Sequence, residues 1–402
     1  MKDNLIALPA LIDPHVHFRT PGAEYKEDWK TAAIACICGG VTTVLDMPNN
    51  TPACVTVEEM EAKKKLIDAQ LKAVDIPLRY GLYLGADQNH LAEIDRAKGK
   101  AIALKIFMGS STGTLLMDDE KALDEAFRRA KAADMLVAVH AEDETLLNAT
   151  KKAFGPTDDP KAHSVIRPNK AAAIAVKRAI EKAAKYGVRL YILHMSTKEE
   201  VALVEEAKRQ GVEVYAEVTP HHLFLTIDDY KTWGTKVQMN PPLRTQEDQD
   251  ALWDAIERGV IDTIGTDHAP HTLAEKERPF GEAPSGVPGV ETLLPLMLDA
   301  VNRGKLTLER LIELTHTNVA KIFRLPPTDD LVFIDMNLEK RVEAANIKSK
   351  CGWTPFEGRV LKGWPLYTQI GGRLISLERV GGKPQFEVCE KKFPSLSPLV
   401  EK

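Results

Sequence analysis

The sequence contains few cysteines and no long apolar segment. Its five cysteines are odd in number and widely spaced, a pattern that is typical of free thiols in a reducing compartment and argues against a disulfide framework. No apolar run reaches the length needed to span a membrane, and the N-terminus shows no signal-peptide pattern. We therefore expect a cytoplasmic protein without a membrane partner.

Concentrated charge of one sign is also missing. The 53 basic and 58 acidic residues give a net charge of −5 with no basic run, which argues against nucleic acid as a partner. What remains is a chain of 402 residues, 44% hydrophobic and 28% charged, which is long enough for one large α/β domain and an appendage. It shows no internal repeat.

Apolar runs alternate with helical segments over residues 1–325. Eight runs predict buried strands: 5–12, 41–47, 78–84, 102–108, 136–140, 190–194, 212–218 and 263–267. Capping-box residues open some of the helices between them, as at Thr56 and Glu59, and we expect Asp118 to cap another. Eight buried strands separated by helices favour a parallel (β/α)8 TIM-type barrel, with a doubly wound open sheet as the alternative.

Residues 326–402 have a different pattern. Short strand-like runs at 330–335, 341–344, 358–363 and 367–377 replace the helical periodicity. We expect a barrel domain over 1–325 and a small β-rich appendage over 326–402. Because little sequence precedes the first barrel strand, the appendage is expected to come mostly from this C-terminal tail or to be incomplete.

Residues that can serve as metal ligands occur at the ends of several predicted strands. His15 and His17 are two apart on an extended backbone, so their side chains project to the same side and can meet one metal ion. A lone His-x-His is more often an ordinary strand end, but four further candidates occupy the ends of other strands: Lys105, His140, His194 and Asp267. In a barrel these ends converge on one face. The pattern therefore favours a metal centre.

These stretches also carry a family resemblance. They are Asp13-Pro14-His15-Val16-His17-Phe18-Arg19, Asp46-Met47-Pro48-Asn49, Leu104-Lys105-Ile106-Phe107-Met108-Gly109, His140-Ala141-Glu142-Asp143, Leu193-His194-Met195-Ser196-Thr197, Met239-Asn240-Pro241-Pro242-Leu243-Arg244 and Thr266-Asp267-His268-Ala269-Pro270-His271. Across nearly its whole length the chain resembles the dihydroorotases of the amidohydrolase superfamily.

The resemblance implies two zinc ions per chain. One would be held by His15, His17 and Asp267, and the other by His140 and His194. Lys105, carboxylated to a carbamate, would bridge them, since a carbamate offers two anionic oxygens and a buried lysine loses its charge readily. The alternative for Lys105 is a substrate-binding cation. Some bacterial relatives bridge their metals with an aspartate and lack this lysine.

The implied reaction is the reversible hydrolysis of the cyclic amide dihydroorotate to N-carbamoyl-L-aspartate, an interconversion of pyrimidine biosynthesis. A hydroxide bridging the metals would attack the ring amide, and Asp267 would act as the catalytic proton shuttle. The small-molecule substrate carries a carboxylate, and Arg19 is two residues past His17, where a guanidinium can bind it bidentately. The remaining expected substrate contacts are Asn49, Asn240, His271, Ser285 and Gly286.

Other functions are compatible with the same residues. Another cyclic amidohydrolase, an allantoinase or a dihydropyrimidinase (hydantoinase), would use the same metals on substrates without the ring carboxylate. A non-catalytic scaffold would need neither the metals nor a substrate.

We interpret 108–116 as a lid that excludes water, with a contact from Thr112, and His221 and His222 as packing or supporting residues. His163 is expected to be ordinary. A homodimer is expected, together with association with another enzyme of the pathway.

Overall fold

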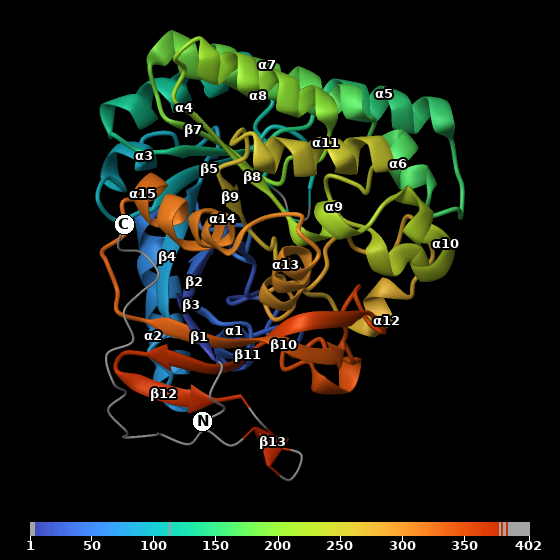
Figure 1. The fold of residues 1–402 in the computed structure, drawn as a ribbon. Coiled ribbons are helices and arrows are strands. Elements are labelled where there is room, and N and C mark those ends of the chain that lie inside the picture. The colour runs from blue at the N-terminus through green and yellow to red at the C-terminus, as the bar shows by residue number, and fades with distance from the viewer. Residues whose placement is uncertain (1–4, 112, 114, 378, 381–382, 385–402) are drawn as a thin grey trace.

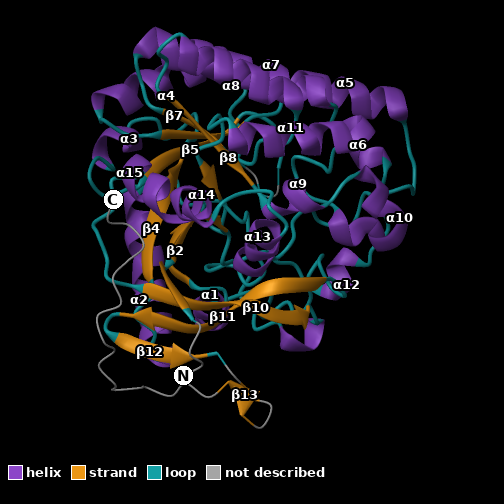
Figure 2. Cartoon of the chain, in the orientation of Figure 1, coloured by secondary structure: helices purple, strands orange, loops and turns teal. Residues whose placement is uncertain are grey.

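Eight parallel strands form a barrel in the part of the chain that the structure, a computed structural model, describes: residues 5–377 except 112 and 114, with 379–380 and 383–384. The strands neighbour one another in chain order inside a layer of helices (Figures 1 and 2). They are β2 (Leu11–Val16), β3 (Val41–Asp46), β4 (Arg79–Gly85), β5 (Ala103–Phe107), β6 (Val137–His140), β7 (Leu190–Ile192), β8 (Val214–Val218) and β9 (Thr263–Ile264). A bridge between Val16 and His268 joins the two ends of the sheet. The predicted (β/α)8 architecture is confirmed.

Many of the outer helices begin at a side-chain cap. The helices include α1 (Trp29–Cys38), α2 (Val57–Val74), α3 (Glu93–Arg96), α4 (Glu120–Ala132), α5 (Glu144–Phe154), α6 (Ala162–Ile166), α7 (Asn169–Tyr186), α8 (Lys198–Arg209), α9 (Pro220–Phe224), α10 (Tyr230–Trp233), α11 (Gln246–Glu257), α12 (Leu273–Lys276), α13 (Leu293–Asn302), α14 (Leu308–Ile312) and α15 (Asn318–Ile322). Those with a side-chain cap include α1, α2, α4, α5, α8 and α11. Thr56 and Glu59 form the expected capping box. The prediction for Asp118 is wrong by one residue, because Asp119 precedes α4 directly and accepts the N–H of Ala122.

Alternation along each strand decides what faces the barrel interior. In β5, Leu104 and Ile106 pack in the large core cluster, whereas Ala103 belongs to a separate smaller cluster. Lys105 has the same parity as Ala103 and therefore projects to the same side of the strand. That smaller cluster also contains Phe323, just after α15, which packs edge-on against Tyr83 of β4 and Tyr191 of β7.

The β-rich appendage is an antiparallel sheet at the lower edge of the barrel in Figure 1. Its strand order is β1 (Ile6–Pro9), β10 (Leu331–Arg341), β11 (Val360–Ile370) and β12 (Arg373–Ser376). The prediction of one strand over 5–12 is wrong, because this run divides between two sheets. Its first half pairs with β10 from Ile6 with Ile334 to Pro9 with Leu331, and its second half begins β2. The first and last parts of the chain thus meet in one sheet.

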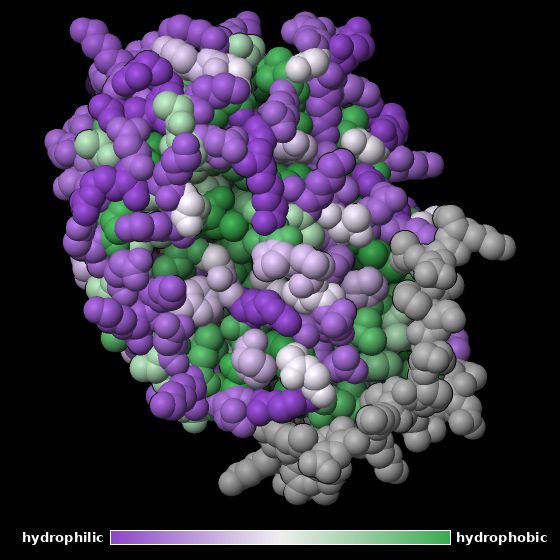
Figure 3. All heavy atoms as spheres, turned by 90° about the vertical axis from the view of Figure 1, so that its left-hand side faces the viewer, coloured by the Kyte–Doolittle hydropathy of each residue, from purple (hydrophilic) through white to green (hydrophobic). Residues whose placement is uncertain are grey.

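The surface is mixed in character. On the face shown in Figure 3, hydrophilic residues dominate the upper part and hydrophobic residues appear in scattered groups lower down. Within the described residues, every helix is too short or too polar to cross a bilayer.

A buried ion pair holds two of the loops that follow barrel strands. Lys63 of α2 lies 2.5 Å from the Asp46 carboxylate, and its Nζ donates to the carbonyl of Met47 at 2.9 Å and to Asn50 Oδ1 at 2.6 Å. The other oxygen of Asp46 accepts the N–H of Phe18 at 2.9 Å. The Lys63 and Asp46 side chains are both buried, so each charge is stabilised by the other and not by water.

We predict that Lys63→Met lowers the free energy of unfolding by about 3–5 kcal/mol, since it leaves the Asp46 carboxylate buried and unpaired. Urea denaturation followed by circular dichroism measures this. The matched control is Lys64→Met, because Lys64 is the exposed neighbour on the same helix. Equal stabilities of the two variants would contradict the assignment.

Candidate active site

Three predicted metal ligands meet at the ends of β2 and β9. The Nε2 atoms of His15 and His17 lie 3.3 and 3.1 Å from Oδ1 of Asp267. Ligands of a tetrahedral zinc ion, with zinc–nitrogen distances of about 2.0–2.1 Å, lie about 3.3 Å from one another. The ligand atoms of the three residues all lie within 4.8 Å of one another. Their spacing therefore fits a metal ion.

Hydrogen bonds at the opposite ring nitrogens orient both histidines. His15 Nδ1 lies 2.8 Å from Oε1 of Glu217 on β8, and His17 Nδ1 lies 2.7 Å from Oδ1 of Asn49. An acceptor at Nδ1 fixes the proton there and leaves the Nε2 lone pair for a metal. Asn49, predicted as a substrate contact, thus also supports a candidate ligand.

A second pair of candidate ligands adjoins the first cluster. His140 Nδ1 lies 3.0 Å from His194 Nε2, so both nitrogens are directed at one place. The ring centroids of His194 and His15 are 5.3 Å apart, which links the two clusters. Burial lowers the pKa values of both His140 and His194, which favours the neutral imidazole that binds metals.

Lys105 is buried within this polar interior. Its side chain is 1% exposed, and Nζ lies 4.5 Å from the centroid of the Phe107 ring. Burial lowers the pKa of Lys105 to about 7, although the carboxylates of Asp267 and Glu217 act in the opposite direction. A substantial fraction of its amine is therefore neutral near pH 7, and the neutral amine is the form that can react with carbon dioxide.

The predicted substrate residues line one small cleft beside the first cluster. The cleft is lined by His17, Arg19, Asn49, Ser111, Asn240, Asp267, Ala269, Ser285 and Gly286. Gly286 has a φ of 137°, and a Cβ there would lie 2.6 Å from the carbonyl oxygen of Ala269. A side chain at this position would therefore clash with the wall of the cleft.

Arg19 and His271 occupy different positions at this cleft. Arg19 lines it, and its Nε donates to the carbonyl of Pro270 at 3.0 Å. His271 is not among the lining residues. Its Nδ1 lies 3.0 Å from Nζ of Lys26, and its Nε2 lies 3.1 Å from the carbonyl oxygen of Ser285 and 3.2 Å from Nη2 of Arg19. His271 therefore supports the cleft wall.

Several supporting residues had no assigned role in the sequence. Glu217 lies inside an otherwise apolar strand. An acidic residue in a buried run is the sequence feature that could have indicated its supporting role. Glu142 lies 3.1 Å from His140 Nε2 and is paired with the buried Arg167. His163, for which the sequence indicated no role, contacts a predicted substrate residue: its Nε2 lies 2.9 Å from Oδ1 of Asn240 and 3.0 Å from the carbonyl oxygen of Met239. No sequence pattern marks the contact with Asn240, which joins residues 77 positions apart.

The start of the predicted lid is anchored. The N–H and hydroxyl of Ser110 each donate to the Glu144 carboxylate at 2.6 Å, and the Ser110 carbonyl accepts from Arg167 at 2.7 Å. Ser111 lines the cleft. Thr112 lies outside the described residues, so the lid remains a prediction. His222 makes supporting contacts, with Nδ1 2.8 Å from the Thr219 hydroxyl.

Comparison with known proteins agrees with this geometry. Residues 6–328 match the model of the amidohydrolase family. The chain is 40% identical to a dihydroorotase of Halobacterium salinarum over 379 residues, covering 92% of this chain and 86% of that protein. It is 38% identical to a dihydroorotase of Methanosarcina mazei, with 94% and 86% covered. Among solved structures it is similar to an L-hydantoinase (dihydropyrimidinase) from Arthrobacter aurescens, with a TM-score of 0.87, 30% identity, and 92% and 85% covered. The chain therefore belongs to the amidohydrolase family, and within it to the dihydroorotases.

Proposed function

We propose that the protein is a dihydroorotase, a hydrolase that reversibly converts N-carbamoyl-L-aspartate to dihydroorotate in the de novo synthesis of pyrimidines. One observation carries the proposal: the guanidinium of Arg19 shares a cleft with His17 and Asp267 of the candidate metal cluster. Dihydroorotate presents a ring amide and a carboxylate on the same small ring, and this cleft offers a matching partner for each. Asn49, Asn240 and the Ser285–Gly286 backbone complete the proposed contacts.

The donor set fits two zinc ions. His15, His17 and Asp267 would hold one ion, His140 and His194 would hold the other, and a carbamate on Lys105 would bridge them. When bound, the metals would polarise the ring carbonyl and lower the pKa of water. The alternative role of Lys105 as a substrate cation is less well supported, because Lys105 does not line the cleft.

The chain's own residues then account for binding and proton transfer. Arg19 would orient the ring through its carboxylate, so that the amide faces Asp267. Both close histidine contacts of Asp267 fall on Oδ1, so we assign proton transfer to Oδ2. In hydrolysis this oxygen would accept a proton from the attacking water and deliver it to the ring nitrogen as the carbon–nitrogen bond breaks. Ring closure would reverse each step.

A hydantoinase-like activity is the second candidate, because solved structures of that kind are similar to this chain. Hydantoins lack the ring carboxylate, so Arg19 would have no counterpart in such a substrate. The expected cytoplasmic location, the homodimer and association with another enzyme of the pathway belong to the same proposal. Sedimentation of the purified protein tests the dimer.

The first test of function is turnover. We expect the zinc-loaded protein to interconvert dihydroorotate and N-carbamoyl-L-aspartate, and Arg19→Met to lower kcat/KM about 100-fold, the order expected for the loss of a charged hydrogen-bonding partner worth about 3 kcal/mol. Arg19→Lys, which keeps the charge but loses the bidentate geometry, should fall between them. Both variants should retain the zinc content of the wild type. Turnover of hydantoin in place of dihydroorotate would favour the second candidate.

A second prediction concerns the bridge. Lys105→Met should reduce the zinc content from about two ions per chain, since the variant cannot form a carbamate. Elemental analysis after dialysis measures this, and ¹³C-bicarbonate labelling should give a carbamate signal only in the wild type. Full zinc content in the variant would exclude the bridge and leave dihydroorotase activity open to a separate test.

A third prediction concerns Glu217. Glu217→Gln should weaken zinc binding by about 10- to 100-fold, because a neutral amide is a poorer acceptor for the Nδ1–H of His15. Competition with a chromophoric chelator gives the affinity. Glu213→Gln is the matched control, since Glu213 is an exposed acid just before the same strand. Indistinguishable affinities would refute the supporting role.

A further inference from the structure

The appendage reaches the substrate side of the barrel through one tryptophan. Trp353 lies in the segment 347–354, between β10 and β11, and is 4% exposed. Its indole Nε1 donates to the carbonyl oxygen of His271 at 2.8 Å. The preceding carbonyl, that of Pro270, accepts from Arg19 at 3.0 Å. Two consecutive carbonyls of one loop are therefore bound, one by the appendage and one by the guanidinium in the cleft.

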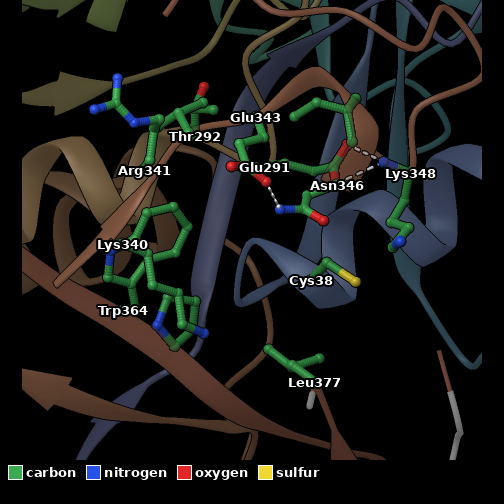
Figure 4. A pocket seen from close by; sticks show the side chains of 13 residues that line it. Cys38, Glu291, Thr292, Lys340, Arg341, Glu343, Asn346, Lys348, Trp364 and Leu377 are labelled. Carbon is green, nitrogen blue, oxygen red and sulfur yellow. Dashed lines mark hydrogen bonds between the residues drawn. The ribbon is translucent and has the colours of Figure 1, made fainter. Parts of the chain in front are cut away.

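Two carboxylates, the half-buried Glu291 and the fully buried Glu27, hold this segment in place. Glu291 accepts the backbone N–H groups of Lys348 and Ser349, each at 2.9 Å. Figure 4 shows the contact between Glu291 and Lys348 from the neighbouring cavity. Glu27 accepts the Lys350 N–H at 3.1 Å and the hydroxyl of Ser349. Hydrogen bonds to carboxylates are among the stronger ones in proteins, so the segment provides a firm base for Trp353.

The same segment also contacts the loop that follows Arg19. Lys350 Nζ donates to Oδ2 of Asp28 and to the carbonyl of Glu24, both at 2.6 Å. Segment 347–354 thus bonds to both loops that bring Arg19 and His271 together. Because Nε2 of His271 in turn lies 3.1 Å from the carbonyl oxygen of Ser285, a shift of the His271 backbone would disturb two sides of the cleft.

We propose that Trp353 is a positioning residue for recognition of the substrate carboxylate, so that the appendage forms part of the substrate site. This inference rests on the proposed function. Trp353 acts through the His271 carbonyl and does not line the cleft. Its loss should therefore impair binding of substrates that carry a carboxylate, and should leave the metal cluster and the chemical step intact.

The test compares two tryptophans of the appendage. Trp353→Phe keeps an aromatic ring and removes the donor to His271. Trp364→Phe is the matched control, because Trp364 Nε1 donates at 2.9 Å to Leu361, within the appendage itself. For each zinc-loaded variant one would measure kcat and KM for dihydroorotate, zinc per chain, the melting temperature, and inhibition by dihydrouracil, the same ring without the carboxylate.

We expect Trp353→Phe to raise KM for dihydroorotate about 5- to 10-fold, as for loss of one buried hydrogen bond, with kcat, zinc and dihydrouracil inhibition unchanged. Trp364→Phe should match the wild type. Lys350→Met should raise KM in the same direction and provides a second variant if Trp353→Phe fails to fold. An unchanged KM, or equal weakening of dihydroorotate and dihydrouracil, would overturn the inference while the proposed function stands. A wild type inactive on dihydroorotate would refute the function, and this inference with it.

Discussion

One buried carboxylate organises the polar interior of the barrel. Glu217 accepts from the His15 ring at 2.8 Å, from the backbone N–H of His194 at 3.0 Å and from the hydroxyl of Tyr191 at 3.0 Å. It therefore ties β8 to the ends of β2 and β7, which supply candidate ligands to the first and the second metal position, respectively. Gly265 makes room for it, since a Cβ there would lie 2.4 Å from Glu217 Oε2. Such an acid is costly to bury unless every oxygen is used, and here the bonds that satisfy it also orient the site.

Much of the fold and of the candidate site could be predicted because strand periodicity and strand ends are local features. The candidate ligands His140, His194 and Asp267 lie at or just after the ends of apolar runs, and a parallel barrel brings such strand ends together. Lys105, expected at a strand end, is instead the middle residue of β5. The division of residues 5–12 between two sheets could not be predicted, because it depends on pairing with β10, more than 300 positions away. The support of Asn240 by His163 and of His271 by Trp353 is equally non-local. The spacing of apolar residues along the sequence does not indicate which distant side chains hydrogen-bond to each other.

The hydantoinase structures and the dihydroorotase sequences are similar to different features of this chain. Similarity to the hydantoinase structure at a TM-score of 0.87 follows the backbone of the barrel, which any cyclic amidohydrolase with this metal arrangement could share. The 40% identity to a dihydroorotase extends over 92% of this chain, loops included. In this chain the loop after β2 presents Arg19 to the cleft. Under the proposed function, this loop residue would distinguish a substrate with a ring carboxylate from one without it.

Three of the six described non-glycine residues with a positive φ belong to the candidate site. Arg19, His194 and Asp267 have φ values of 58°, 38° and 46°, a region that costs non-glycine residues of order 1–3 kcal/mol each. Each is held by polar contacts: Arg19 by the Pro270 carbonyl, His194 by Glu217, and Asp267 by the two ligand histidines. A bound metal and a bound carboxylate would add contacts to just these residues, and a ligand that binds the native state stabilises it. At these three residues the strain would therefore be offset by ligand binding, and before a ligand arrives it is the polar contacts from the neighbouring strands and loops that maintain their conformation.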